Sequence, residues 1–459
     1  MAANPSTAVW LRRVNLADRP IYRAILRALE SAVRDGVLNP GDQLPAQRAV
    51  ASHLGIDFTT VTRAYGVARA RGLVEGAAGR GTFVSRGARD LDAGLVDLSM
   101  NLPPQPHGLS LARLLRETTA TILERTEVSA LMAYQAGAGS PAQKAAGAAW
   151  IAPCAGEIPL ERMLVCAGAQ TALAAVLSTL TRPGDTIVAE ALTYPGLLAV
   201  TSALGLRLLS CPCDDQGLIP EALAELCAHG PRAIYCVPTL HNPTTATMGL
   251  ERRREIAGIA AAASVPFIED DAYGRLPAEP WPSLCSLSPG GGYYLSTLSK
   301  CLSPGLRIAF VAAPDPTAAQ RVAQALRSLS LMAAPMMSAV AAAWIRDGVA
   351  DDVLEGIRVE ARERRRIAAE ILPQARGGAE SLHVWVDLPK HLDIGAIRDG
   401  VRERGLALVT SEAFASSEDA PSGVRISLGA PSTRMVLTGA LKSLAGILGD
   451  TPPAARLVV

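Results

Sequence analysis

The sequence predicts a multidomain protein, with a small winged helix-turn-helix at the N-terminus and a large C-terminal α/β domain that carries a smaller α+β subdomain. Its 459 residues are too many for one ordinary hydrophobic core. Residues 1–89 contain thirteen arginines and six acidic residues, a net charge of +7, although the whole chain carries only +1. Beyond residue 97, continuous apolar runs alternate with Ala- and Leu-rich helical segments, which is typical of a mostly parallel sheet with helices on both faces.

Composition narrows the class of protein further. Apolar residues make up 49% of the chain and the net charge is close to zero, so we expect a globular rather than a disordered protein. No apolar stretch is long and clean enough to span a bilayer, and residues 1–10 show no signal-peptide pattern. The eight cysteines are scattered and lack zinc-site spacing, so we expect reduced thiols, no metal site and a cytoplasmic location.

Three segments are expected along the chain. Residues 1–85 form the winged helix-turn-helix, residues 86–96 are polar and without periodicity, as in a linker, and residues 97–459 form the α/β domain. The first segment contains three predicted helices and two short strands, over residues 20–36, 46–54, 58–71, 73–75 and 82–84. Gly55 separates the second helix from the third, which is typical of a helix-turn-helix, and a glycine-rich loop joins the strands into a wing.

The basic N-terminal part indicates a polyanionic partner, and we predict double-stranded operator DNA. The third helix would enter the major groove as the recognition helix, and the wing tip would reach a phosphate or a narrow minor groove. The candidate DNA contacts are Arg48, Thr59, Thr60, Thr62, Arg63 and Arg80. An arginine-rich solvated surface is the alternative interpretation of the charge alone.

The same segment resembles the GntR-type winged helix over about residues 18–85. The matching residues include Leu44-Pro45, Arg48, Leu54-Gly55, Thr60-Val61, Ala64-Tyr65, Gly72-Leu73 and the run over 79–84. The resemblance implies that Arg48 contacts the DNA backbone and that the Thr and Arg residues of the third helix read bases.

The α/β domain is expected to contain eight strands. Their predicted positions are residues 163–166, 186–189, 207–211, 233–237, 266–269, 293–296, 308–312 and 382–388. The last strand follows a long charged helix over 351–372 and marks the smaller subdomain. Ligands bind at the carboxyl ends of strands in such sheets, and the polar residues of this domain fall there.

Lys300 is one of only four lysines in a chain with forty arginines. An amine can lose its proton and condense with an aldehyde, which a guanidinium cannot do. The run over residues 296–307 resembles the cofactor-binding lysine motif of fold-type I pyridoxal-phosphate (PLP) enzymes, the aspartate-aminotransferase superfamily. The resemblance implies that Lys300 is the catalytic lysine that binds PLP, and that Thr297, Ser299 and Arg307 hold the cofactor phosphate.

PLP also needs partners for its ring, its pyridine nitrogen and its phenolic oxygen. Candidates occur in the order that the superfamily uses: Gly168, Ala169, Gln170, Tyr194, Asn242, Asp270 and Tyr273. The first three open a helix directly after a strand, where backbone N–H groups can bind phosphate. By resemblance, the ring of Tyr194 stacks on the pyridine ring, and Asn242 and Tyr273 donate to the phenolic oxygen.

Two neighbouring carboxylates are candidates for the partner of the pyridine nitrogen. Asp270 ends a predicted strand, and the Asp-x-x-Tyr spacing to Tyr273 favours it over Asp271. A buried carboxylate keeps the nitrogen protonated through an ion pair. Thr245 stands where the superfamily has glycine in the turn after Asn242, a departure that concerns the turn rather than the role of the amide.

Two further residues are assigned to the substrate or effector. Arg425 matches the arginine that binds the α-carboxylate of an amino acid bidentately, with a structural surface arginine as the alternative. Tyr134 matches a tyrosine that reaches phosphate or substrate across a dimer interface in relatives, so we expect a homodimer. The aminotransferase resemblance spans roughly residues 97–450.

A winged helix joined to an aminotransferase-like body is similar to the MocR subfamily of GntR regulators over nearly the entire chain. We therefore predict a PLP-dependent transcriptional regulator that senses an amino acid, an amine or PLP through its aminotransferase-like domain. The alternative is an active aminotransferase that carries a DNA-binding module, since the residues for a transamination half-reaction are all present. A sensor of PLP concentration alone is a third interpretation.

Overall fold

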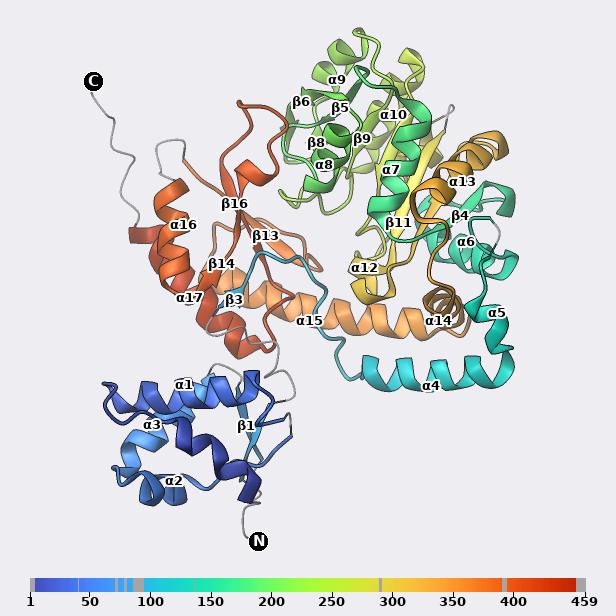
Figure 1. The fold of residues 1–459 in the computed structure, drawn as a ribbon. Coiled ribbons are helices and arrows are strands. Elements are labelled where there is room, and N and C mark those ends of the chain that lie inside the picture. Colours follow the sequence, from blue (N-terminus) through green and yellow to red (C-terminus); the bar gives the residue numbers. More distant parts are fainter. Residues whose placement is uncertain are drawn as a thin grey trace, which may run out of the picture. The chain divides into compact units, whose positions relative to one another are not determined.

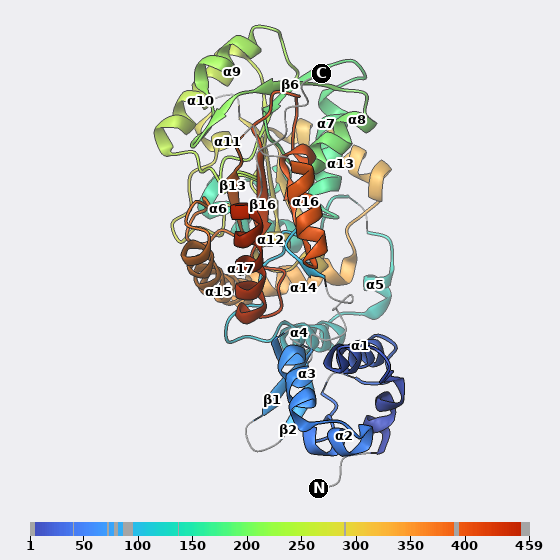
Figure 2. The same ribbon diagram turned by 90° about the vertical axis from the view of Figure 1, so that its left-hand side faces the viewer.

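The computed structural model describes residues 5–39, 41–70, 73–77, 81–85, 95–135, 137–288, 291–389 and 394–450. The chain divides into two compact units, whose elements are labelled in Figures 1 and 2. The first contains Met1–Leu98, Gly395–Ala407 and Pro431–Thr451, and the second contains Ser99–Ile394 and Leu408–Ala430. Two C-terminal segments therefore belong to the same unit as the N-terminal residues.

The winged helix-turn-helix lies in the first unit. Its elements are η1 (Pro5–Arg13), α1 (Ile21–Arg34), α2 (Gln47–Leu54), α3 (Phe58–Ala70), β1 (Val74–Ala77) and β2 (Gly81–Val84). One apolar core joins them, and its buried side chains include Trp10, Ile25, Leu29, Val61 and Tyr65. The two strands pair antiparallel, as predicted for a wing, and the wing tip with Arg80 lies outside the described residues.

Local chemistry explains the turn between α2 and α3. Gly55 ends α2 with a φ of +63°, a left-handed conformation that glycine adopts without strain. Asp57 then caps α3, because its Oδ1 accepts a hydrogen bond from the Thr59 backbone N–H at 2.7 Å. The Tyr65 hydroxyl donates to the Pro45 carbonyl at 2.9 Å and ties α3 to the segment before α2.

The rest of the first unit is assembled from both ends of the chain. Strand β3 (Val96–Asp97) pairs in parallel with β14 (Leu406–Ala407), and α16 (Ile394–Glu403) and α17 (Arg434–Asp450) complete the group. Of the predicted linker, residues 86–94 lie outside the described residues, and Val96 already belongs to β3. A two-residue strand whose partner lies far along the chain leaves no periodic pattern, so the sequence did not reveal it.

A seven-stranded sheet forms the centre of the second unit. Its strands are β4 (Met163–Cys166), β5 (Thr186–Glu190), β6 (Arg207–Cys211), β9 (Ile234–Cys236), β10 (Phe267–Asp270), β11 (Gly292–Thr297) and β12 (Ala309–Ala312). They lie in the order β4-β12-β11-β10-β9-β5-β6. Only β12 runs antiparallel to its neighbours, β11 and β4, so the predicted mostly parallel sheet is confirmed.

Both faces of this sheet are apolar, because successive residues of a strand point to opposite faces. In β9, Tyr235 belongs to one buried cluster, whereas Ile234 and Cys236 belong to another. Helix α7 (Ala169–Leu180) packs on the first face together with α13 (Pro316–Ser330). Helices α9 (Pro220–Cys227), α10 (Leu250–Ala263) and α11 (Leu284–Leu287) contribute to the second cluster. The predicted cover of helices on both faces is therefore present.

A smaller antiparallel sheet completes the second unit. It consists of β13 (His383–Asp387), β16 (Gly423–Ser427) and β15 (Val409–Thr410), in the order β13-β16-β15. The long helix α15 (Val349–Ile371) precedes it, and Arg364 on this helix donates to the Leu428 carbonyl at 2.8 Å. The strand predicted over 382–388 and the α+β subdomain are thus found.

The remaining elements of the second unit are short strands and surrounding helices. They are β7 (Cys213–Asp214), β8 (Gly217–Leu218), α4 (Leu111–Arg125), α5 (Val128–Met132), α6 (Pro141–Ala155), α8 (Pro195–Ala203), α12 (Leu298–Cys301) and α14 (Pro335–Arg346), with the 3-10 helices η3 (Leu160–Arg162), η4 (Pro304–Leu306) and η5 (Ser411–Ala413). None of the helices described has the length and apolar character that a membrane crossing requires. Within the same described ranges, no group of three or more His, Cys, Asp or Glu side chains is arranged to hold a metal ion.

Candidate functional site

Lys300 lies in the single-turn helix α12, which begins directly after the central strand β11. Its Nζ donates to the main-chain oxygen of Asn101 at 2.6 Å. Burial and then the Arg425 guanidinium lower the pKa of Lys300 to about 8, although the Asp270 carboxylate opposes this shift. An amine with this pKa is partly unprotonated near neutral pH, which is the form that attacks an aldehyde.

Groups that suit a phosphate lie where α7 and α12 begin. Gly168 caps α7 with a φ of +89°, and a Cβ added there would lie 2.5 Å from Nη2 of Arg307. Glycine at this position leaves room for the guanidinium beside the positive end of α7, which begins at Ala169. Thr297 caps α12, and its hydroxyl lies 3.0 Å from that of Ser299. The structure thus brings the predicted phosphate-binding groups to the starts of two helices in one unit.

Tyr194 and Gln170 lie together at the start of α8. A Cβ on Gly196 would lie 2.2 Å from both the Gln170 Oε1 and the Tyr194 ring. Gln170 Nε2 donates to the Gly196 carbonyl at 2.8 Å. Burial raises the pKa of Tyr194, the Asp270 carboxylate raises it further, and Arg307 acts in the opposite direction. The Tyr194 ring therefore lies within electrostatic reach of both the predicted acid and the predicted phosphate-binding arginine.

The two neighbouring aspartates face different surroundings. Asp270 accepts a hydrogen bond from the Tyr235 hydroxyl at 2.9 Å, and its charge acts on Lys300 and Tyr194. Asp271 instead accepts from the Tyr294 hydroxyl at 2.7 Å. The Oδ1 atoms of both aspartates are buried and have no hydrogen-bond partner among the described residues, so the effect of the Asp270 charge on Lys300 and Tyr194 is what distinguishes the two. These surroundings support Asp270 as the carboxylate that meets the cofactor.

Asn242 and Arg425 are brought together from distant segments. The Arg425 Nη1 donates to the Asn242 Oδ1 at 2.8 Å, and its Nη2 donates to the Ser99 carbonyl. Its guanidinium carbon also lies 5.0 Å from the centre of the Phe414 ring. With its oxygen held by Arg425, the Asn242 amide can present its nitrogen as a donor.

Thr245 occupies a backbone conformation that suits glycine better. Its φ is +64°, in the left-handed region that a β-branched residue rarely adopts. Its backbone N–H donates to the His241 carbonyl at 2.6 Å, so the turn after Asn242 closes in spite of the side chain. Threonine in place of glycine at position 245 therefore adds local strain to the turn. The Asn242 amide remains in contact with Arg425.

Tyr134 is not part of this cluster. Its side chain is 83% exposed. Its assignment to a partner's phosphate or substrate stays a prediction that one copy of the chain does not test.

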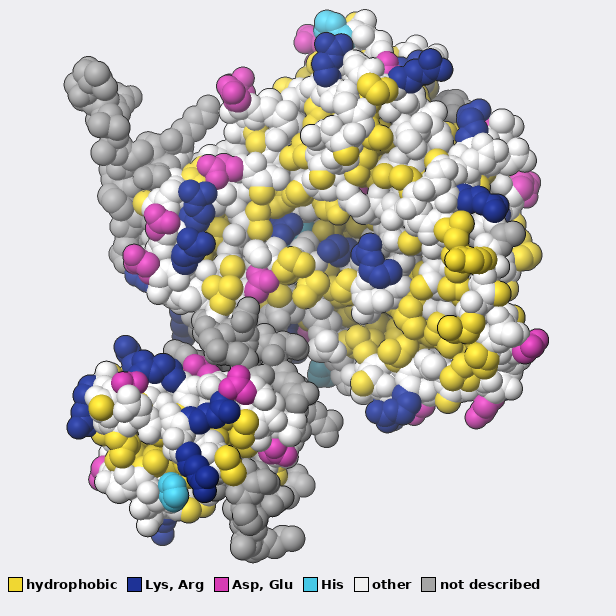
Figure 3. All heavy atoms as spheres, viewed as in Figure 1, with side chains coloured by type: hydrophobic (Ala, Val, Ile, Leu, Met, Phe, Trp, Pro, Cys, Tyr) yellow, Lys and Arg dark blue, Asp and Glu magenta, His cyan; other side chains and the backbone are white. Residues whose placement is uncertain are grey.

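The predicted DNA contacts lie on the surface of the winged helix-turn-helix. Exposed side chains there include Arg48, Thr59, Thr62 and Arg63, while Thr60 is half-buried. The Arg63 guanidinium stacks over the Tyr22 ring at 4.3 Å, and the Thr62 hydroxyl donates to Gln47 at 2.9 Å. Figure 3 shows Lys and Arg side chains at several places on the drawn face of this module.

Sequence reasoning missed several buried polar residues around this site. They are Asn101, Tyr235, Arg253, Glu269 and His383. Burial raises the pKa of the Glu269 carboxyl to about 7, although Arg253 lies 3.7 Å away and opposes this shift. A polar residue inside an otherwise apolar strand was the available signal for Tyr235, Glu269 and His383. No local pattern marks Asn101, which lies in an irregular segment.

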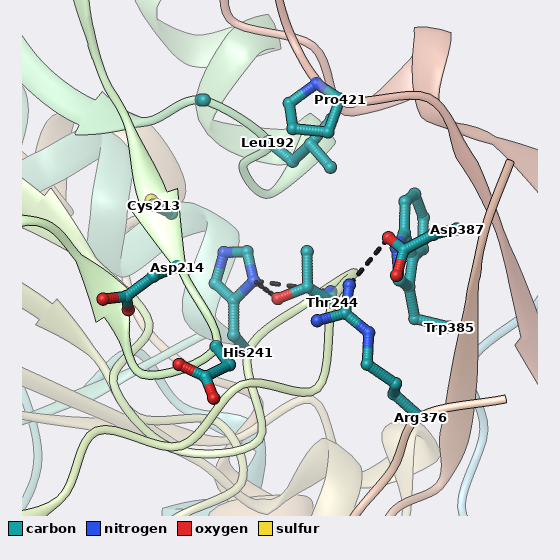
Figure 4. A pocket seen from close by; sticks show the side chains of 11 residues that line it. Leu192, Cys213, Asp214, His241, Thr244, Arg376, Trp385, Asp387 and Pro421 are labelled. Carbon is teal, nitrogen blue, oxygen red and sulfur yellow. Dashed lines mark hydrogen bonds and ion pairs between the residues drawn. The ribbon is translucent and has the colours of Figure 1, made fainter. Parts of the chain in front are cut away.

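A separate pocket of about 200 Å³ lies beside the turn that holds Asn242. It is lined by Ala191, Leu192, Cys213, Asp214, Asp215, His241, Thr244, Arg376, Trp385, Asp387 and Pro421, most of which Figure 4 labels. Arg376 pairs with Asp387 at 2.7 Å, and the His241 Nδ1 lies 2.7 Å from the Thr244 hydroxyl. None of the predicted cofactor residues lines this pocket, so it is distinct from the Lys300 site.

Comparison with protein families decides the class of the larger domain. Residues 93–444 match the family described as "Aminotransferase class I and II". The chain belongs to this family. Residues 21–84 match "Bacterial regulatory proteins, gntR family", so a GntR-type helix-turn-helix precedes the aminotransferase domain.

Similar proteins include named transcriptional regulators and a solved aminotransferase. The uncharacterized HTH-type transcriptional regulator YdeF of Bacillus subtilis is 29% identical over 453 residues, which cover 96% of this chain and 97% of that protein. The HTH-type transcriptional regulator TauR of Rhodobacter capsulatus is 28% identical over 436 residues, covering 84% and 88%. The kynurenine aminotransferase of Pyrococcus horikoshii, crystallised with PMP, has a TM-score of 0.71 and 25% identity over 78% of this chain and 92% of that one. The predicted MocR-type combination and the fold-type I aminotransferase fold are confirmed.

The aminotransferase domain implies PLP as its cofactor, and the residues present fit it. The start of α7 at Gly168 and the neighbouring Arg307 guanidinium offer donors and positive charge to a phosphate. The buried Asp270 Oδ1 lacks a partner, as expected of an oxygen that pairs with a pyridinium nitrogen. Lys300, Tyr194 and Tyr273 lie close enough to this carboxylate for its charge to affect their pKa values.

We expect Asp270→Asn to affect stability and cofactor retention in opposite directions. Burial raises the pKa of Asp270 from 3.8 to about 6, so its ionisation above about pH 6 opposes folding. In the cofactor-free protein, the substitution should therefore raise the free energy of unfolding at pH 7 by up to about 3 kcal/mol. This gain should disappear as the pH falls from about 6 to about 4, where the carboxyl is neutral in both states. Cofactor retention should fall, because a neutral amide cannot form an ion pair with a protonated pyridine nitrogen.

Denaturant unfolding of the cofactor-free protein at pH 7 and pH 4, together with the rate of cofactor release, measures both effects. Asp215→Asn provides the matched control, because it removes an exposed carboxylate. A less stable Asp270→Asn protein at pH 7 would contradict the assignment.

Proposed function

We propose that the protein is a transcriptional regulator that binds operator DNA through its winged helix-turn-helix and an amino compound or PLP through its aminotransferase domain. The observation that carries this proposal is that one chain joins a GntR-type helix-turn-helix to an aminotransferase domain that contains the predicted cofactor-binding side chains. Similarity to YdeF and TauR over most of their lengths supports it, because both are named transcriptional regulators.

When bound, PLP supplies an aldehyde that condenses with primary amines and a ring that withdraws electrons. The chain supplies the groups that exploit it. Lys300, with a pKa of about 8, accepts and releases a proton near neutral pH. Asp270 holds the proton on the pyridine nitrogen, and Arg307 neutralises phosphate charge. A regulator needs only that amine exchange at this site changes the relative stability of two conformations.

An amino acid is the effector class that the site fits best. Arg425 presents a planar guanidinium that suits bidentate binding of a carboxylate, and it is buried against Phe414. Its contact with the Asn242 Oδ1 at 2.8 Å orients the guanidinium towards the cofactor-binding residues. An amine without a carboxylate, or PLP itself, would not need this arginine.

An active aminotransferase is the alternative function, because the groups for proton transfer are the same in both. The experiment that separates the two measures keto-acid production and operator affinity on one sample, with and without amino acids. We expect slow or undetectable turnover and a ligand-dependent change in DNA affinity. Fast multiple turnover, with DNA affinity unaffected by ligand or PLP, would favour the enzyme.

We expect Arg63→Ala to weaken operator binding by roughly 1–3 kcal/mol and to relax discrimination at one base pair, because an exposed arginine on a recognition helix can read a base edge. Footprinting on operators with single base changes tests this. Arg27 lies on α1 and pairs with Asp18 at 2.7 Å, so Arg27→Ala is the matched control with expected wild-type affinity. Equal losses across all base changes would assign Arg63 to a phosphate instead.

A homodimer is the assembly that the surface of the second unit supports. Exposed apolar side chains occur on and beside α4 and α5: Leu115, Leu123, Val128, Met132 and Tyr134. Figure 3 shows hydrophobic side chains gathered in the part of the drawn face where Figure 1 places α4, α5 and α14. A surface of this kind is typical of an interface, and a dimer would match the two half-sites of a palindromic operator.

A further inference from the structure

Three buried side chains from distant segments form a hydrogen-bonded chain that ends at Tyr273. Asn101 Nδ2 lies 2.9 Å from Tyr273 Oη and 3.0 Å from His383 Nδ1. His383 Nε2 lies 3.3 Å from the main-chain oxygen of His241. The exposed fractions of Asn101, Tyr273 and His383 are 6%, 3% and 0%, so water does not compete for these contacts.

The chemistry of the groups fixes the direction of each bond. An amide nitrogen only donates, so the two Asn101 Nδ2 hydrogens go to Tyr273 Oη and His383 Nδ1. The neutral His383 ring then carries its proton on Nε2 and donates it to the His241 carbonyl. Because Tyr273 Oη accepts a hydrogen bond from Asn101, the proton of the Tyr273 hydroxyl points away from Asn101. Burial raises the pKa of Tyr273, so the hydroxyl keeps that proton.

The orientation of the Asn101 amide depends on His383. Asn101 Oδ1 is buried and has no hydrogen-bond partner among the described residues. A rotated amide would place this oxygen against Tyr273 and accept the phenol proton. His383 Nδ1 favours the observed orientation because it offers an acceptor to the amide nitrogen. Burial and then the Arg425 guanidinium hold the pKa of His383 well below its usual range, so this acceptor is retained.

We propose that Asn101 and His383 are positioning residues that direct the Tyr273 hydroxyl proton towards the phenolic oxygen of the cofactor. The proposal concerns how the cofactor is held and does not depend on DNA binding. A donor to the phenolic oxygen stabilises its anionic form. It therefore lowers the pH at which the cofactor-loaded protein loses a proton and changes its visible absorption.

His383→Phe tests the proposal because it keeps an aromatic ring and removes both hydrogen bonds. The absorption midpoint should rise by about one pH unit and cofactor release should become about tenfold faster, as expected for the loss of one buried hydrogen bond. His383→Gln should restore both values, since its Oε1 can accept from Asn101 while its Nε2 donates to the His241 carbonyl. The charged groups Asp270, Lys300, Arg307 and Arg425 are unchanged in every variant.

The Tyr273→Phe background separates positioning from a general structural effect. In that background, His383→Phe should shift the midpoint no further, because no phenol proton remains to be directed. Trp344→Phe is the matched control, because it removes a partly buried hydrogen bond of the second unit, the one from Nε1 to Thr118 at 2.8 Å. An unchanged midpoint in His383→Phe, or an equal shift in the Tyr273→Phe background, would overturn the proposal.

Nitrogen NMR of histidine-labelled, cofactor-free protein provides a second measurement that needs no variant to bind cofactor. The spectrum of His383→Gln identifies the His383 signals among the six histidines. We expect an unprotonated Nδ1 and a protonated Nε2 in His383. The opposite tautomer would place a donor against Asn101 Nδ2 and would refute the proposed direction of the chain.

Discussion

Lys300→Ala is expected to abolish stable attachment of the cofactor and the visible absorption that accompanies it. The reason is chemical: Lys300 is the lysine whose pKa the Asp270 and Arg307 charges affect, and arginine cannot condense with an aldehyde. Gel filtration of PLP-treated protein followed by absorbance measures retention. Borohydride reduction and peptide mass analysis should place the cofactor on Lys300.

The other lysines provide the matched controls. Lys144 is half-buried on α6 and Lys442 is exposed on α17, so Lys144→Ala and Lys442→Ala should both retain the cofactor. The pKa of about 8 adds a second expectation for the wild type. The rate of cofactor attachment should rise with pH as the amine loses its proton, and should level off above about pH 8 to 9. A label on any other lysine would refute the site.

Arg425→Ala is expected to remove the spectral response to amino acids while leaving PLP bound. The substitution removes the planar guanidinium that suits a carboxylate. Losing such a buried, charge-assisted pair weakens binding of the amino acid by about thirtyfold or more. Lys300, Asp270 and Arg307 are unchanged, so retention of the cofactor should persist. Absorbance titration with amino acids and with the corresponding decarboxylated amines measures the difference.

Two variants control for the charge and for the loss of an arginine. Arg425→Lys keeps the positive charge but lacks the two parallel N–H donors of a guanidinium, so it should recover only part of the spectral response to amino acids. Arg376→Ala removes an arginine that pairs with Asp387 in the separate pocket, and it should respond as the wild type does. If the response of Arg425→Ala to amino acids is unchanged, the effector is an amine without a carboxylate or PLP itself.

Local sequence patterns were sufficient to predict the strands of the sheet and the order of the candidate site residues along the chain. Continuous apolar runs predicted β4 and β6 at their observed bounds and the other sheet strands within one or two residues. The scarcity of lysine and the run up to Arg307 located Lys300, and the Asp-x-x-Tyr spacing favoured Asp270. These features are local because strand propensity, helix capping and motif spacing depend on residues a few positions apart.

The surroundings of each site residue were decided only by the tertiary structure. Tyr235 supports Asp270 from the neighbouring strand β9, while Tyr294 engages Asp271 from β11. The partners of Arg425 and Tyr273 come from segments far apart in the chain, and β3 finds its partner in β14. Local sequence patterns do not reveal which distant segments pair, because that choice depends on the packing of the whole fold. The sequence therefore determined which chemistry is present, and the fold determined how each reactive group is oriented and charged.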